Sequence, residues 1–121
     1  MRSVMLAVIA IGQLAGKIGE EPSEPAMRVA FESRVASDVQ AAIDFALETG
    51  GPAAVAKIHA AGTDRFEIRT FQKLACTRNA IEPGYTCRFL VDIDVVGGGL
   101  QSVLVGRFFP GSNGLDFALR S

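Results

Sequence analysis

Two cysteines, Cys76 and Cys87, are the residues of this chain whose type and spacing most directly indicate chemistry. They lie on either side of Pro83-Gly84, a typical turn pair, and an alternating apolar stretch follows the second cysteine. A disulfide between them would close a loop of about a dozen residues, which stabilises a fold by roughly 3 kcal/mol in the chain-entropy model. The alternative is two buried free thiols, because free cysteine packs as a small hydrophobe. We expect the disulfide, since the spacing fits a hairpin and the N-terminus indicates export.

Other groups that could do chemistry are few. His59 is the only histidine, and we interpret it as a half-exposed surface residue on a short helix. Asp92 and Asp94 project from one strand face, as paired catalytic carboxylates can, but nothing apolar is expected around them to raise a pKa. Gly97-Gly98-Gly99 lacks the lysine and the following Ser/Thr of a phosphate-binding loop, and it predicts a turn. We therefore predict no catalytic residue, no cofactor and no metal site, because two cysteines and one histidine leave a tetrahedral ligand set incomplete.

The residues around the cysteines predict a β-hairpin. In the stretch 85–95 every odd position is apolar or cysteine, a period of two that indicates a half-buried strand, and 66–76 is its antiparallel partner. Setting Cys76 opposite Cys87 places the apolar residues of both strands on one face. That register puts Leu74 opposite Phe89, Ile68 opposite Val95 and Arg69 opposite Asp94 as an ion pair. Phe71 falls on the wrong face, which predicts a bulge over 70–72.

A long helix is predicted from about Glu24 to Thr49, with Ser23 as its N-cap and Pro25 in its first turn. Gly50-Gly51-Pro52 should end it, and a short second helix should run from Pro52 to Ala61 before Gly62. Apolar residues recur every four positions along the long helix, and we expect this stripe to cover the apolar face of the sheet. The stripe consists of Met27, Phe31, Val35, Val39, Ile43 and Leu47.

Two further strands complete the predicted fold. The stretch 100–109 is the third strand, 110–114 a hairpin turn, and 115–120 the fourth strand. Helices followed by an antiparallel meander predict an α+β domain, with a long and a short helix packed on a four-stranded sheet.

The N-terminus predicts export to the periplasm or the extracellular space. Arg2 precedes the apolar run 4–11, and small residues follow, which is typical of a secretory signal. The run is too short for a comfortable membrane span, which takes about 20 apolar residues. A buried helix or an uncleaved anchor are the alternatives. We divide the chain into a signal-like segment (1–19), a Pro- and acid-rich linker (20–25) and one domain (26–121).

The net charge of the domain argues against negatively charged partners such as nucleic acid and anionic lipid. The 12 basic side chains include Arg2 and Lys17, so 10 remain against 13 acidic ones after residue 19, a net charge of −3. Such a domain has no general electrostatic attraction to nucleic acid or to anionic lipid.

The order of elements resembles the cystatin-like architecture, a long helix across a curved four-stranded antiparallel sheet. The segment from Phe66 to Cys87, with its string F-x-K-L-x-C…P-G-Y-x-C-x-F, resembles small exported bacterial proteins of this shape. Gln101-Ser-Val-Leu-Val-Gly106 also resembles the Q-x-V-x-G string of protease-inhibiting cystatins, although it is one residue longer and the Pro-Trp of their second hairpin is missing. Inhibition of a cysteine protease is therefore one alternative function.

Two classes of function remain open at this point. The first is a non-enzymatic binding module for a protein, a peptide or an envelope component, and the second is an enzyme or small-ligand carrier with a cavity between helix and sheet. We favour the binding module, because few polar groups are expected to point inward. Adjacent Phe108 and Phe109 cannot both face the core, and loops on a rigid scaffold often carry recognition residues. The expected binding surface comprises Pro83, Gly84, Phe108, Phe109, Pro110 and Asn113.

Overall fold

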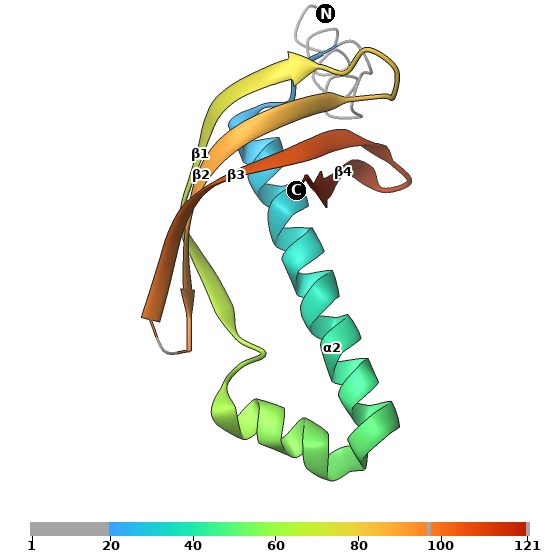
Figure 1. The fold of residues 1–121 in the computed structure, drawn as a ribbon, viewed down its shortest axis with the longest axis vertical. Helices are drawn as coiled ribbons and strands as arrows, with labels where there is room; N and C mark the ends of the chain where they lie inside the picture. The colour runs from blue at the N-terminus through green and yellow to red at the C-terminus, as the bar shows by residue number, and fades with distance from the viewer. Residues whose placement is uncertain (1–19, 97, 121) are drawn as a thin grey trace, which may run out of the picture.

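A computed structural model describes residues 20–96 and 98–120, so the signal-like segment 1–19 lies outside the described residues. Its elements are α2 (Glu24–Ala61), β1 (Phe66–Arg78), β2 (Tyr85–Val95), β3 (Gly98–Gly111) and β4 (Gly114–Leu119). The four strands form one antiparallel sheet in the order β1-β2-β3-β4, and α2 crosses its concave side (Figure 1). The expected α+β fold is confirmed. No helix in the described part of the chain is long and apolar enough to cross a membrane.

α2 is one kinked element, whose two helical arms meet where the sequence predicts the long helix to end and the short one to begin. Ser23 caps its start by accepting a hydrogen bond from the backbone N–H of Ala26 at 3.3 Å, as expected. The kink lies at Gly51, whose φ of 71° and ψ of −172° are not helical and which directly precedes Pro52. Gly62 ends the element in the left-handed conformation, with φ of 76°.

The prediction that the whole helical stripe is buried is wrong. Only Met27, Ala30 and Phe31 of α2 are buried, whereas Val35, Val39 and Ile43 are half-buried and Leu47 is 51 % exposed. The reason is direction: α2 leaves the sheet after its first turns and runs beyond it (Figure 1). The periodic pattern identified the apolar side of the helix, but it could not show how far the sheet would accompany it.

The β1–β2 register also differs from the predicted one. Cys76 pairs with Cys87 as expected, but Lys73 pairs with Phe89 and Ile68 with Ile93. The strand has two bulges, between Ile68 and Thr70 and between Lys73 and Ala75, where one bulge over 70–72 was predicted. Two inserted residues change the side-chain alternation twice, so Phe71 turns inward (6 % exposed) and Leu74 outward (39 % exposed).

Both bulges are held by the first turns of α2. The Arg28 guanidinium donates a hydrogen bond to the carbonyl of Ile68 at 2.6 Å, beside the first bulge. Glu24 Oε1 accepts from the backbone N–H of Lys73 at 2.8 Å, beside the second. The Lys73 ammonium in turn contacts Glu21 and donates to the carbonyl of Pro22 at 2.8 Å. The linker and the helix start are thereby tied to the β1 edge.

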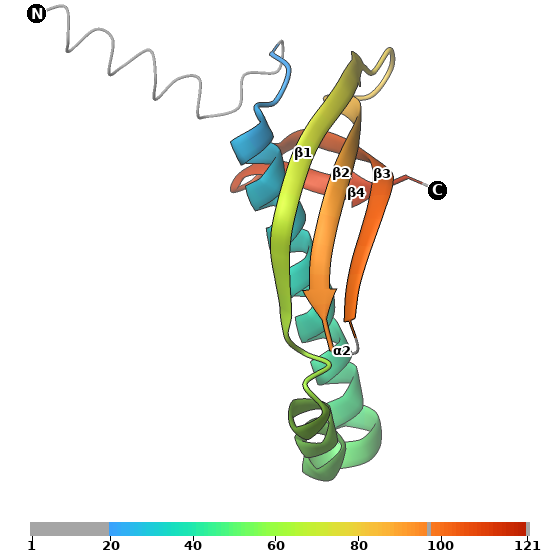
Figure 2. The ribbon, with the colours of Figure 1, turned by 90° about the vertical axis from the view of Figure 1, so that its left-hand side faces the viewer.

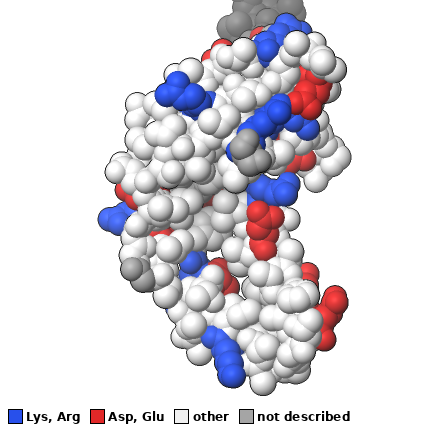
Figure 3. Space-filling model, in the orientation of Figure 1, with Lys and Arg blue, Asp and Glu red and all other residues white. Residues whose placement is uncertain are grey.

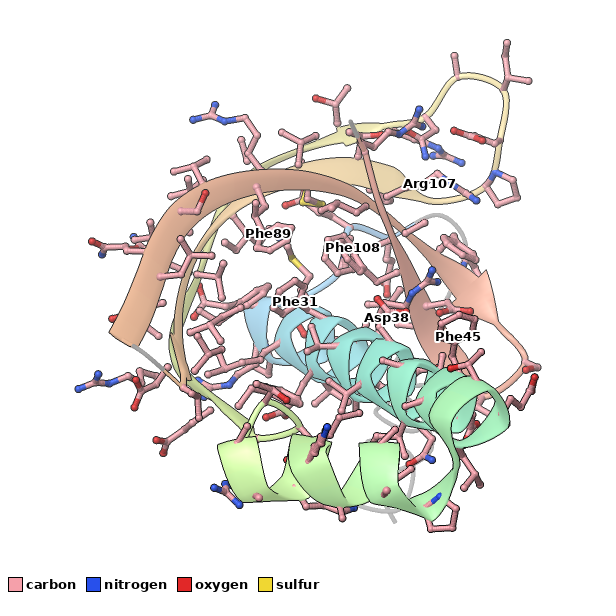
Figure 4. All side chains as sticks on the ribbon, turned by 60° about the horizontal axis from the view of Figure 1, so that its bottom comes forward. Phe31, Asp38, Phe45, Phe89, Arg107 and Phe108 are labelled. Carbon is pink, nitrogen blue, oxygen red and sulfur yellow. A yellow bond between two sulfur atoms is a disulfide. The ribbon has the colours of Figure 1, made fainter. Side chains whose placement is uncertain are left out.

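Aromatic rings fill the core between α2 and the sheet. Phe31 of α2 points toward Phe89 and Phe108 beneath the strands (Figure 4). Centroids of neighbouring rings are 4.9 to 5.8 Å apart, in tilted, edge-on or stacked arrangements. Gly106 leaves room for this cluster, because a Cβ there would collide with the Phe117 ring. The rings are Phe31, Phe71, Phe89, Phe108 and Phe117.

The last hairpin is longer than predicted. β3 extends over 98–111 instead of 100–109, and Gly111 pairs with Gly114. The turn is therefore only Ser112-Asn113, and Pro110 lies within β3 opposite Leu115.

Candidate functional site

The predicted disulfide joins Cys76 and Cys87 across β1 and β2 and leaves no free cysteine among the described residues. Cys87 is buried and pairs on its other side with Gly106 of β3. The bond therefore lies beneath the start of the β1–β2 turn and fixes the two strands that carry it.

Backbone geometry and short hydrogen bonds order this turn. Gly84 has φ of +96°, where a side chain is strained, and a Cβ there would also collide with the carbonyl oxygen of Phe108. The N–H of Asn79 donates to the carbonyl of Gly84 at 3.0 Å. The Thr86 hydroxyl donates to Asn79 Oδ1 at 2.6 Å. The turn is thus closed on itself and packed closely against β3.

Arg107 of β3 connects the turn to the rest of the sheet. Its Nη1 donates to the carbonyl of Pro83 at 3.1 Å, and its guanidinium carbon lies 3.9 Å from the centroid of the Phe109 ring. Its Nε is 3.7 Å from a Glu82 carboxylate oxygen, and Arg120 binds the other oxygen of the same carboxylate. We call this group, comprising Asn79–Gly84, Arg107, Phe109 and Arg120, the turn cluster.

Ile81 is the exposed apolar residue of the turn cluster. Its side chain is 99 % exposed, the highest value among the large apolar residues of the described chain. A shallow hollow of about 360 Å³ beside it is lined by Asn79, Ala80, Glu82 and Arg120. Basic and acidic side chains lie side by side over this end of the sheet (Figure 3). The cluster therefore presents an apolar side chain flanked by both signs of charge.

The predicted binding residues separate in the structure. Pro83, Gly84 and Phe109 come together in the turn cluster, while Phe108 is 1 % exposed and belongs to the core. Only one of the two adjacent phenylalanines faces outward, as the sequence required. Asn113 is exposed in the separate β3–β4 turn.

Sequence reasoning missed six residues of the cluster: Asn79, Ala80, Ile81, Glu82, Arg107 and Arg120. A signal for Ile81 was available, since it is a lone large apolar residue within the turn sequence 79–84. The meeting of Arg107 and Arg120 at Glu82 depends on the β3–β4 register, which no local pattern specifies.

A second concave surface lies between the two arms of α2 and the start of β1. This hollow measures about 400 Å³ and is lined by Val35, Asp38, Val39, Ala42, Ile43, Ile58, Thr63 and Asp64. The molecular surface is hollowed between the sheet and α2 (Figure 3). The lining is mostly apolar, but it includes two carboxylates and a hydroxyl, more polar groups than the sequence led us to expect.

His59 and Asp64 form a pair at the margin of this hollow. His59 Nδ1 lies 2.7 Å from Asp64 Oδ2, and the His59 side chain is 56 % exposed. The hydrogen bond from His59 is the main reason that the pKa of Asp64 lies below its ordinary value of 3.8, and partial burial opposes it. His59 is the surface residue that the sequence predicts.

Asp92 and Asp94 lie on the outer face of β2. Asp94 is 4.0 Å from Arg69, so the predicted ion pair is confirmed, although the bulge makes Glu67 and not Arg69 the direct partner of Asp94. The inhibitor-like string 101–106 lies within β3, not in a hairpin loop. Residues 20–96 and 98–120 contain no group of three or more His, Cys, Asp or Glu side chains placed to hold a metal ion.

Comparisons with known proteins identify no match for this chain. The chain matches no protein-family model, no curated protein and no solved structure.

Proposed function

We propose that this protein is a non-enzymatic binding module that recognises a protein or peptide partner through the turn cluster. The observation that carries the proposal is Ile81, a fully exposed apolar side chain on a turn that is fixed from both sides. Single exposed apolar residues are common on protein surfaces. Ile81 differs from them in its setting, because the residues on either side are held by hydrogen bonds and ion pairs.

A fixed turn favours binding for an entropic reason. Association loses the freedom of every loop and side chain that must become ordered, and a preorganised surface reduces that loss. Here the disulfide, Gly84 and the Arg107–Pro83 hydrogen bond order the turn before any partner arrives. The partner that fits is one with an apolar pocket for Ile81 and groups of either charge around it, since Glu82 and Arg120 flank that side chain.

Replacement of Ile81 tests the proposal. Ile81→Ser should leave the unfolding temperature unchanged and should abolish capture of the partner from an envelope extract, quantified by mass spectrometry. Val29→Ser is the matched control, because Val29 is 66 % exposed on α2 and does not belong to the turn cluster. If Ile81→Ser and wild type capture the same proteins in the same amounts, the turn cluster is not the binding surface.

We also infer export and a cystatin-like arrangement for this module. The disulfide of a small domain supports export, because such bonds persist in oxidising compartments. The helix before a four-stranded antiparallel meander supports the architectural resemblance. Native protein should resist alkylation until it is reduced, and two thiols that react without reduction would contradict export.

The hollow between the arms of α2 supports a second candidate, a carrier of a small apolar ligand. Its volume lies within the range typical of ligand sites. Binding of the fluorescent amine N-phenyl-1-naphthylamine should then be weakened by Ile43→Ser but not by Leu47→Ser, a residue of the same helix outside the hollow. Equal binding by both variants would remove this candidate.

A further inference from the structure

Half of β3 lacks a neighbour on its outer side. β4 pairs only with Gly106–Gly111, and beyond it the Arg120 N–H donates to the carbonyl of Val105 at 2.9 Å. Among the described residues, no strand pairs with the outer side of Gly98–Leu104, which we call the open edge. β3 is the outermost strand over this length, and in the side view no described helix or strand lies along its outer side (Figure 2).

The hydrogen bond from Arg120 to Val105 shows which backbone groups of the open edge point away from β2. In an antiparallel strand the N–H and C=O of one residue point to the same side, and the side alternates along the chain. Because the Val105 carbonyl points away from β2, the N–H and C=O of Gln101 and Val103 do so as well. These groups form a row of unpaired donors and acceptors ready to bind another strand.

The outer edge of β1 and the open edge of β3 differ in how far they are protected from pairing with another strand. β1 has two bulges, and Glu24 already binds the backbone N–H of Lys73. Bulges and edge charges are the usual protection against unwanted strand pairing. The open edge has no bulge against β2 and no charged residue from Val95 to Gly106, and its Leu100 and Val103 are 58 % and 51 % exposed. It has none of the protection that β1 has.

We propose that the open edge pairs antiparallel with the open edge of a second copy of this chain. The proposal goes beyond the binding function, because it uses a different surface. A two-fold axis at Ser102 places Leu100 of each copy opposite Leu104 of the other, and the Gln101 and Val103 backbones exchange hydrogen bonds across it. Since the segment is uncharged, no like charges meet. Because a two-fold pairing uses the open edge of both copies, the assembly closes as a dimer.

The dimer would place the two turn clusters far apart. The open edge begins at the β2–β3 turn, and the turn cluster lies at the opposite end of β2. Pairing would extend the sheet from four strands to eight and would carry one turn cluster at each distal end. Two linked sites raise the avidity for a partner that presents two copies of its epitope.

Light scattering on the full chain tests the pairing by measuring the molar mass. The protein concentration should run from about 1 µM to about 1 mM, because an interface of one short strand is expected to be weak. Wild type should change from monomer to dimer over this range. Val103→Lys should remain monomeric with an unchanged unfolding temperature, while the matched Val29→Lys should dimerise like wild type. Three results would overturn the proposal. Wild type could remain a monomer at every concentration, it could form a species larger than the dimer, or Val103→Lys could still dimerise.

A crosslinking experiment tests the register. Residues in a non-hydrogen-bonded antiparallel pair have Cα atoms about 4.5 Å apart, within reach of a disulfide. Ser102→Cys faces itself across the axis and should form a covalent dimer under mild oxidation, whereas Leu100→Cys should not. Crosslinking by Leu100→Cys and not by Ser102→Cys would overturn the stated pairing.

Discussion

At the end of the sheet that carries the turn cluster, α2 packs on the strands, five phenylalanine rings meet and a disulfide joins β1 to β2. At the other end the same strands continue with apolar residues on the same face, but α2 has departed, and Val95 and Leu100 are 44 % and 58 % exposed. The difference teaches that alternation determines which face of a strand is apolar, whereas burial depends on what covers that face. We call these the closed end and the open end.

The largest expected difference between the two ends is in the response to deletion of an apolar side chain. Phe89 is fully buried and lies against four other rings, so Phe89→Ala should lower the free energy of unfolding by about 3–5 kcal/mol. Leu100→Ala at the open end should change it by less than about 0.5 kcal/mol in dilute protein. Urea denaturation measures both. Similar losses would mean that the open end is covered.

The disulfide should have the next largest effect, since it closes a loop at the closed end. Cys76→Ala with Cys87→Ala should lower the free energy of unfolding by about 3 kcal/mol. Because the bond lies beneath the turn cluster, the same variant should also reduce capture of the partner. A variant as stable as wild type would show that the aromatic cluster alone holds β1 on β2.

Two glycines of β3 give a matched pair across the ends. Gly106→Ala at the closed end places a methyl group into the Phe117 ring and should destabilise by about 1–3 kcal/mol. Gly99→Ala at the open end meets only atoms at 3.7 Å and should be neutral or slightly stabilising. Thermal unfolding of the two variants compares them directly, and equal shifts would contradict the contrast.

The smallest expected effect concerns Asp64. Its folded pKa is lowered, so its contribution to stability is present above the ordinary carboxyl pKa and is lost as the pH falls through the lowered value. His59→Ala removes the main cause and should move the pKa of Asp64 back toward 3.8. An NMR titration of the Asp64 carboxyl group measures this. An unchanged pKa would assign the shift to Arg65 and the backbone instead.

Sequence patterns predicted the elements of this fold better than their contacts. Ser23, Gly51 and Gly62 mark where α2 begins, kinks and ends, because capping and left-handed backbone are local properties. The two bulges of β1 were not predictable in number, since they are clamped by Glu24 and Arg28 from a distant helix. The exposed half of α2 was missed for the same reason, because only the tertiary direction of the helix decides its burial.

The candidate site shows the same division between local and distant information. The disulfide and the tight turn at Pro83-Gly84 follow from residues close in sequence. Arg107 of β3 and Arg120, directly after β4, reach Glu82 from more than twenty residues away, through a register that depends on the whole sheet. The open edge could not be inferred from β3 itself, because it exists only where β4 ends.

Hydrogen exchange of individual amides at two protein concentrations tests the contrast between the ends most directly. In dilute protein the amides of Gln101 and Val103 should exchange rapidly, because they point away from β2, while those in the phenylalanine core should be strongly protected. In concentrated protein the Gln101 and Val103 amides should become protected and the core amides should not change. Slow exchange of Gln101 and Val103 in dilute protein would contradict the account, because it would show that the edge is already covered within one chain.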